Sequence, residues 1–145
     1  MSARTLRTFA DMELGATSSH TTTIEPKHVS AYAALTGDHN PIHEDTEYTA
    51  TTRFGRPVAH GLLVAGFVQT ALTKLVAPGG VSTGYQINLV APAFAGATIT
   101  AHATCAQLNS VTRRATFTIA VVDDETGATL VSGTAVVAFP KGDHR

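Results

Sequence analysis

Hydrophobic and polar residues alternate along much of the second half of the chain, and this alternation predicts β-strands. The clearest runs lie at residues 85–89, 98–105 and 117–121, and a turn after the third run leads into a further apolar segment at 130–139. A period of two is typical of antiparallel strands that bury one face. The Thr-rich segment 17–24 predicts an additional first strand, so we expect five strands.

Between the first strand and the others, the sequence predicts three helices. Pro26 begins the first helix and Gly37 ends it. A short second helix is expected at about residues 41–51, with Asn40 as its N-cap. The third helix, residues 61–77, has no polar side chain in most of its first half. We therefore expect protein to surround that half on most sides, and the more polar second half to emerge toward solvent.

This order of elements predicts an α+β fold. An antiparallel five-stranded sheet wrapped around a long central helix covers the apolar helix with few elements, and this arrangement is known as the hot-dog fold. A ferredoxin-like sandwich would place a second long helix between the later strands, and none is visible. The length favours a single domain over residues 1–145, in which residues 1–16 form a lead-in without a definite element.

The composition constrains partners and location. Hydrophobic residues make up 43% of the chain and charged residues only 14%, so we expect a homodimer that buries apolar surface. A net charge of −1 argues against the basic surface that nucleic-acid binding needs. Residues 1–15 do not resemble a secretory signal, and no apolar segment is long enough to span a membrane. The expected location is therefore cytoplasmic.

Thiol and metal chemistry are not expected. Cys105 is the single cysteine, so neither a disulfide nor a thiolate metal site can form, and its position in a predicted strand favours a packing role. His39 and His43 are four residues apart, which invites comparison with metal sites. Pro41 lies between them, however, and no third ligand follows nearby.

The segment YAALTGDHNPIH, residues 32–43, carries the most specific signal. It resembles the hydratase motif of the MaoC-like (R)-specific enoyl-CoA hydratases, whose core is Gly-Asp-x-Asn-Pro-x-His. Further similarity at residues 54–62, 92–94 and 133–135 extends the resemblance over roughly residues 20–140. The resemblance implies a hydro-lyase that converts a trans-2-enoyl-CoA to a (3R)-hydroxyacyl-CoA, or catalyses the reverse dehydration. It implies an acyl-CoA or acyl-carrier-protein thioester as substrate and no cofactor.

By the same resemblance, Asp38 and His43 are the catalytic pair, holding one water between them, with acid and base roles unassigned. Gly61 begins the long predicted helix, where its N–H lacks an intrahelical partner and could hold the thioester oxygen. Close packing would equally explain a glycine there. Asn40 is expected chiefly to fix the geometry of the pair, and His60 to be a loop or capping residue. The candidate substrate-binding residues are Asn40, His60, Leu62 and Phe94.

One position departs from the family pattern, and two other functions remain open. Many members carry a small hydroxyl residue one turn into the long helix, where this chain has Gly66. A hot-dog acyl-CoA thioesterase would use Asp38 but leave His43 without a purpose. A non-catalytic acyl-thioester-binding subunit of a hetero-oligomer is favoured by Gly66 and the low charge, and disfavoured by the intact pair.

Overall fold

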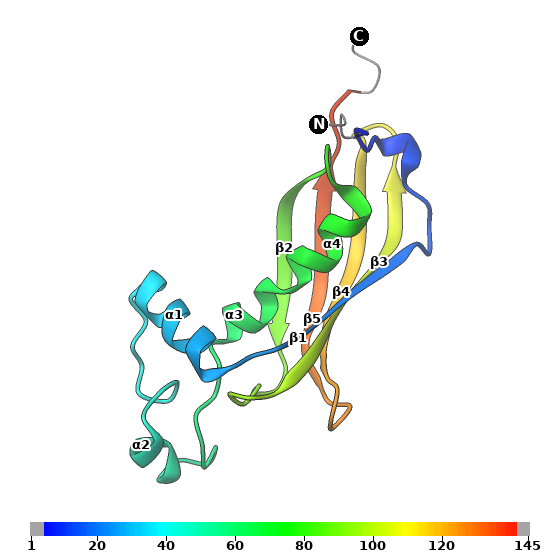
Figure 1. Cartoon of the computed structure of the whole chain (residues 1–145). Coiled ribbons are helices and arrows are strands. Elements are labelled where there is room, and N and C mark those ends of the chain that lie inside the picture. The colour runs from blue at the N-terminus through cyan, green and yellow to red at the C-terminus, as the bar shows by residue number, and fades with distance from the viewer. Residues whose placement is uncertain (1–4, 142–145) are drawn as a thin grey trace.

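A computed structural model describes residues 5–141, which contain one antiparallel sheet of five strands (Figure 1). The strand order across the sheet is β1-β3-β4-β5-β2, so β1 and β2 are the edges. The strands are β1 (Thr17–Thr23), β2 (Val81–Leu89), β3 (Thr98–Asn109), β4 (Arg114–Asp123) and β5 (Thr129–Ala138). The predicted antiparallel five-stranded sheet is confirmed.

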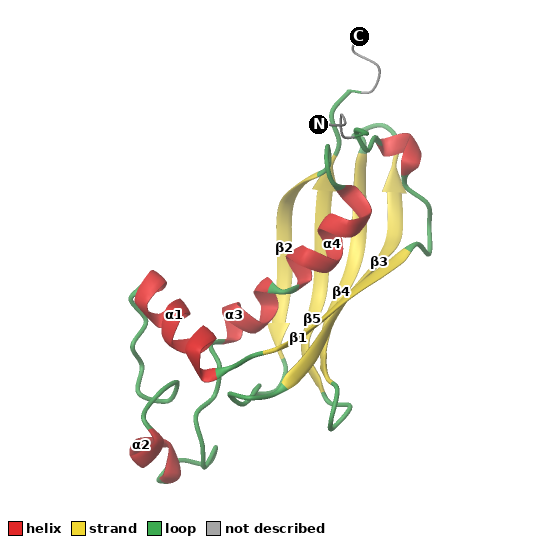
Figure 2. Cartoon of the chain, in the orientation of Figure 1, coloured by secondary structure: helices red, strands yellow, loops and turns green. Residues whose placement is uncertain are grey.

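The helices divide into two groups (Figure 2). The helices α3 (Gly61–Gly66) and α4 (Val68–Val76) lie across one face of the sheet, as the hot-dog arrangement predicts. The helices α1 (Pro26–Thr36) and α2 (Thr46–Ala50) lie beyond one end of the sheet, together with the loops that connect them to α3. No helix within residues 5–141 is both long enough and apolar enough to cross a bilayer.

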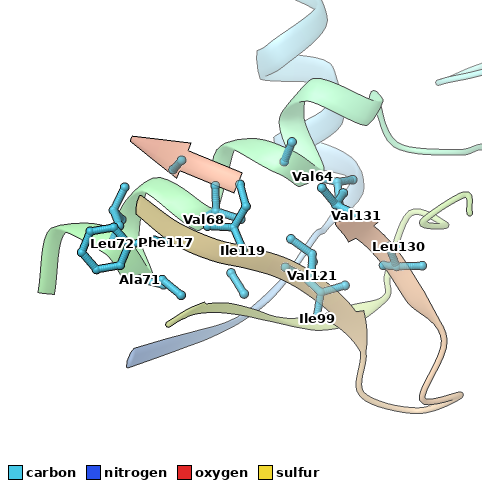
Figure 3. Close-up of a cluster of buried hydrophobic side chains, with 14 of the residues drawn as sticks. Val64, Val68, Ala71, Leu72, Ile99, Phe117, Ile119, Val121, Leu130 and Val131 are labelled. Carbon is cyan, nitrogen blue, oxygen red and sulfur yellow. The ribbon is translucent and has the colours of Figure 1, made fainter. Parts of the chain in front are cut away.

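The core lies between α4 and the inner face of the sheet (Figure 3). Along β3 and β4, buried residues alternate with more exposed ones, which is the pattern expected from the sequence. Val68, Ala71 and Leu72 of α4 face Phe117 and Ile119 of β4 in this cluster. Phe117 is the largest of the fully buried side chains, so the fold depends strongly on its packing.

The long helix is interrupted, which the sequence did not lead us to expect. The side-chain amide of Gln69 donates to the Gly66 carbonyl at 3.1 Å. The backbone N–H of Thr70, which would bond to the Gly66 carbonyl in a regular helix, donates to the Phe67 carbonyl at 3.2 Å. Because glycine also weakens a helix, the regular hydrogen-bond ladder breaks between α3 and α4.

The expectation that protein surrounds the first half of this helix on most sides is met except at Leu62. Val64, Ala65 and Val68 are buried, whereas Leu62 is 63% exposed. The sheet covers one side of the helix, and nothing within residues 5–141 covers Leu62 on the opposite side of α3. The second half does present Gln69, Thr73 and Lys74 to solvent, as expected.

Two further local predictions need correction. The second helix begins at Thr46 rather than near Pro41, because the Asp45 carboxylate caps it by accepting from the Tyr48 N–H at 2.9 Å. The segment expected as a lead-in contains a short 3₁₀ helix, η1 (Phe9–Asp11), whose Phe9 ring contacts Phe139 edge-on at 6.4 Å between centroids. The first four residues of that segment lie outside the described part of the chain.

We expect the substitution Phe117→Ala to lower the free energy of unfolding by about 3–5 kcal/mol, because it leaves a cavity in the core. Denaturant unfolding followed by circular dichroism measures this change. Val111→Ala is the matched control, since Val111 is 88% exposed and its truncation should change the stability by less than about 0.5 kcal/mol. Equal losses from both substitutions would contradict the assigned core.

Candidate active site

Asp38 leaves α1 through a tight reversal of the chain. Gly37 has a positive φ of 83° and ends the helix by donating its N–H to the Ala33 carbonyl, a left-handed conformation that favours glycine. The Asp38 carboxylate then accepts from the Asn40 N–H at 3.1 Å. This bond fixes the loop conformation while Oδ2 of Asp38 remains available to other groups.

His43 is held from a different segment of the chain. Its side chain is buried, and Nδ1 lies 2.7 Å from the Val58 carbonyl oxygen. A carbonyl can only accept, so Nδ1 carries the hydrogen and Nε2 of the neutral ring presents a lone pair. The Val58 N–H also donates to the Ile42 carbonyl at 3.0 Å. Val58 therefore fixes both the backbone next to His43 and the orientation of its ring.

The pair faces each other across a gap. Oδ2 of Asp38 and Nε2 of His43 are 3.8 Å apart, and the Asp38 side chain is 55% exposed whereas that of His43 is 8% exposed. Both atoms are acceptors when the ring is neutral, so neither can hydrogen-bond directly to the other. A water oxygen to one side of the line that joins the two atoms, about 2.8 Å from each, can donate one hydrogen to each.

His60 completes the cluster. It is buried, its ring stacks on that of His43 with centroids 3.6 Å apart and 24° between planes, and its Nε2 lies 3.0 Å from the Asp38 carbonyl oxygen. Tyr32 of α1 contacts the same ring at 4.8 Å between centroids. His60 thus makes contacts within the protein, and its predicted role in substrate binding remains untested.

The three side chains Asp38, His43 and His60 offer ligand atoms within 4.8 Å of one another, so their fit to a metal ion needs testing. Nδ1 of His43 and Nε2 of His60 already donate to carbonyl oxygens. The two imidazole rings are stacked with centroids 3.6 Å apart, so the lone pairs in their ring planes do not converge on one point. A tetrahedral metal site requires such convergence. The arrangement suits a water held by two acceptors better than a metal.

Gly61 borders the cavity that His43 also lines. It is the first residue of α3, so its N–H has no acceptor within that helix. A Cβ on Gly61 would collide with the side chain of Leu89 at the end of β2. Leu89 is 56% exposed and the atoms met are the end of its flexible side chain, so an alanine here would require that side chain to turn away.

The cavity has a volume of about 530 Å³ and is mostly apolar. Phe94 lines it and pairs with Val58 through an isolated β-bridge. Arg53 is the charged residue of its lining, and the Arg56 guanidinium lies 4.0 Å from the centroid of the Phe94 ring. Apolar walls with a few polar groups are typical of small-molecule sites.

Two other predicted substrate-binding residues lie elsewhere. Leu62 lines a separate shallow groove between α3 and β2, together with Gly66, Tyr85 and Ile87. Asn40 is exposed, and its side chain accepts from the Ile42 N–H at 3.3 Å. This bond supports the prediction that Asn40 shapes the loop, although the loop continues as a turn rather than directly as a helix.

Comparison with protein families matches residues 8–127 to the MaoC like domain. The chain belongs to the MaoC-like domain family. A 3-hydroxybutyryl-CoA dehydratase of Methylorubrum extorquens is 36% identical over 138 residues, covering 94% of this chain and 86% of that protein. An (R)-specific enoyl-CoA hydratase of Rhodospirillum rubrum is 34% identical over 140 residues, covering 93% of both chains.

Solved structures agree with this assignment. The (R)-hydratase from Aeromonas caviae involved in PHA biosynthesis superposes with a TM-score of 0.85 at 33% identity, covering 89% of this chain and 98% of that chain. The hot-dog fold predicted from the sequence is therefore confirmed both by the architecture of this MaoC-like chain and by its structural relatives.

Cys105 has the packing role expected of it in this MaoC-like domain. It is buried in β3, and burial raises the pKa of its thiol, which lowers the fraction of reactive thiolate at neutral pH. The thiol therefore contributes little to the reactivity of the folded protein.

Val58 and Leu89 are site residues that the sequence did not reveal. Val58 acts through its carbonyl, which every residue possesses, so no side-chain pattern could identify it. Leu89 belongs to β2 and reaches Gly61 only after the sheet and α3 have packed together. The Gly37-Asp38-x-Asn40-Pro41-x-His43 motif was the signal for the rest of this MaoC-like site.

We expect Gly61→Ala to lower the free energy of unfolding by about 1 kcal/mol or less, because its methyl group would make the flexible, exposed Leu89 side chain turn away. In a protein that already carries Leu89→Ala, the Gly61→Ala substitution should lower the free energy of unfolding by less than it does in the wild type. A double-mutant cycle measured by denaturant unfolding tests this coupling. Purely additive effects would show that Leu89 is not the reason for glycine at this position.

Proposed function

We propose that the protein is an (R)-specific enoyl-CoA hydratase, or a dehydratase in the reverse direction, with Asp38 and His43 as the catalytic pair. The observation that carries the proposal is the 3.8 Å separation of Oδ2 of Asp38 from Nε2 of His43, which lets one water beside the two atoms donate a hydrogen to each. Membership of the MaoC-like family and the hydratase and dehydratase names of the relatives support the same reaction.

The two acceptors orient the water for addition. When the water attacks the β-carbon of a 2-enoyl thioester, one of its protons passes to the pair, and the α-carbon must receive a proton to complete the product. Holding the water and the double bond in one geometry lowers the entropic part of the barrier. The reverse dehydration uses the same groups in reverse order.

Negative charge develops on the thioester oxygen as the water adds, and we assign its stabilisation to the N–H of Gly61. This N–H lies at the beginning of α3 beside the cavity that His43 lines. A backbone donor aimed at a developing oxyanion can contribute about 3–4 kcal/mol to transition-state stabilisation.

The substrate is an acyl thioester carried by coenzyme A or by an acyl carrier protein. The apolar cavity beside His43 and Gly61 gives this substrate a binding site, and Phe94 is the predicted contact residue that lines it. Arg53 at the same cavity can attract anionic groups of a carrier. The expected cytoplasmic location stays a prediction from the sequence.

The functional unit is a homodimer built through the edge strand β2. Among residues 5–141 this strand pairs only with β5, so its other edge there has backbone groups that a second copy can bond. Large apolar side chains are exposed along β2 and on the adjacent turn of α3. A second copy that covers them accounts for the small fraction of charged residues in the chain. These apolar residues are Leu62, Val81, Tyr85 and Leu89.

The catalytic assignment is tested with crotonyl-CoA by following the loss of enoyl-thioester absorbance and analysing the stereochemistry of the product. Asp38→Asn and His43→Gln should each lower kcat by about 10²–10⁴-fold, because each replaces a group that can take up a proton with a neutral amide that cannot. His39→Ala is the matched control from the same loop. His39 is exposed and lies 3.9 Å from Glu44 rather than facing the pair, so its loss should leave kcat nearly unchanged.

Other results would identify the rival functions. Release of free thiol, with the carbon–carbon double bond retained in the acid product, would indicate a thioesterase. The buried Cys105 gives little background in an assay for free thiol. Inertness toward crotonyl-CoA and longer enoyl chains, with stability only in the presence of another chain, would indicate a non-catalytic subunit.

The homodimer is tested with Tyr85→Lys, which places like charges near each other across the proposed interface. We expect light scattering after size-exclusion chromatography to give the dimer mass for the wild type and the monomer mass for the variant. Val111→Lys, on the exposed β3–β4 turn, should remain dimeric. A wild-type protein that is monomeric at micromolar concentration would contradict the assembly.

A further inference from the structure

We propose that His60 is a positioning residue that holds Asp38, His43 and Gly61 in one arrangement, an inference that rests on the proposed hydratase function. His60 touches all three parts of the site. Its Nε2 lies 3.0 Å from the Asp38 carbonyl oxygen, its ring stacks on His43 at 3.6 Å, and it precedes Gly61 directly as the N-cap of α3.

The hydrogen bond to Asp38 has a defined direction. A carbonyl oxygen accepts, so Nε2 of His60 carries the hydrogen and Nδ1 of the neutral ring has the lone pair. This bond joins the loop after α1 to the residue before α3, across 22 positions of the sequence. Together with the bond from the Asn40 N–H to the Asp38 carboxylate, it holds the Asp38 residue at both its backbone and its side chain.

The stacking contact limits the His43 ring in a second direction. The bond from Nδ1 of His43 to the Val58 carbonyl acts in the plane of the ring, whereas His60 covers one face of it. Tyr32 contacts the His60 ring at 4.8 Å and 59°, so His60 is itself supported from α1. An in-plane bond and a face contact together fix where Nε2 of His43 points.

A purely structural role would not require histidine at this position. Nδ1 of His60 is buried and has no hydrogen-bond partner among the described residues, and leaving such a group unpaired is unfavourable. A phenylalanine ring would fill similar space without that disadvantage. The polar ring is therefore explained by the bond it donates to Asp38 rather than by packing.

Three variants separate the hydrogen bond from the stacking. His60→Phe keeps a ring but removes the donor. His60→Gln places an amide N–H near the former Nε2, while His60→Asn has the same amide one methylene group shorter, so it cannot reach the Asp38 carbonyl in the same way. We expect kcat to fall at least about 10-fold in the Phe and Asn variants, whereas KM should change by less than about 2-fold. The unfolding midpoint of the Phe variant should be at least as high as that of the wild type. The Gln variant should retain at least about 5-fold more of kcat than the Asn variant.

A second measurement does not depend on activity. Amide hydrogen exchange, followed by nuclear magnetic resonance, should be at least about 10-fold faster at Asp38 and Asn40 in the Phe and Asn variants than in the wild type or the Gln variant. In the Asp38→Asn background, His60→Phe should lower kcat little further, because the group that it positions is already removed.

Several results would overturn the proposal. Equal kcat values for the Gln and Asn variants, or loss of kcat only in proportion to loss of stability, would reduce His60 to a structural residue. Unchanged exchange at Asp38 and Asn40 in all three variants would do the same. If the wild type proves inactive toward enoyl thioesters, the proposed function fails, and the exchange rates alone still decide whether His60 holds the Asp38 loop.

Discussion

Burial of one face of the α3–α4 segment against the sheet is the constraint on which the rest of the structure depends. The apolar side chains of α4 and the inner face of β3 and β4 form one continuous core, and apolar burial of this kind is the main driving force of folding. Because the segment must lie along the sheet, the beginning of α3 is fixed near one end of it. The site is assembled at that end.

The residues of the candidate site come from three segments that have no regular structure in common. Asp38 and His43 belong to the loops that follow α1, Val58 and His60 to the segment that enters α3, and Gly61 to the first position of α3 itself. Hydrogen bonds between Val58 and residues 42–43, and between His60 and Asp38, join these segments. A loop site therefore gains rigidity from its connection to the end of a packed helix.

The same constraint explains the exposed apolar surface. The sheet covers one side of α3, and β2 forms the edge of the sheet. Leu62 of α3 and Tyr85 of β2 therefore remain exposed in a single chain. An open strand edge beside apolar side chains is a surface that proteins normally cover. Gly66 lies in the same groove, where a Cβ would meet only Gln69 Nε2 at 3.7 Å. The Cβ of a larger residue would therefore make an ordinary van der Waals contact at this position.

The sequence alone determined the strands, the sheet-forming alternation, the first helix and the motif that contains Asp38 and His43, the proposed catalytic pair. These features depend on local periodicity, on Gly37 at a helix end and on a short specific motif, all of which act within a few residues. The beginning of α2 was missed because Asn40 and Asp45 are both good capping residues, and the competition between them is settled by the whole loop. The interruption after Gly66 was missed because it depends on the direction of the Gln69 side chain.

Only the tertiary structure decided how the site is held. The distance between Asp38 and His43, the bond from His43 to the Val58 carbonyl and the stacking of His60 join residues up to 22 positions apart. Backbone carbonyls and ring stacking leave no trace in residue order, because any residue supplies a carbonyl and any buried histidine could stack. The sequence therefore identified the groups to which we assign the chemistry, whereas packing of the loops against the beginning of α3 gave those groups their geometry.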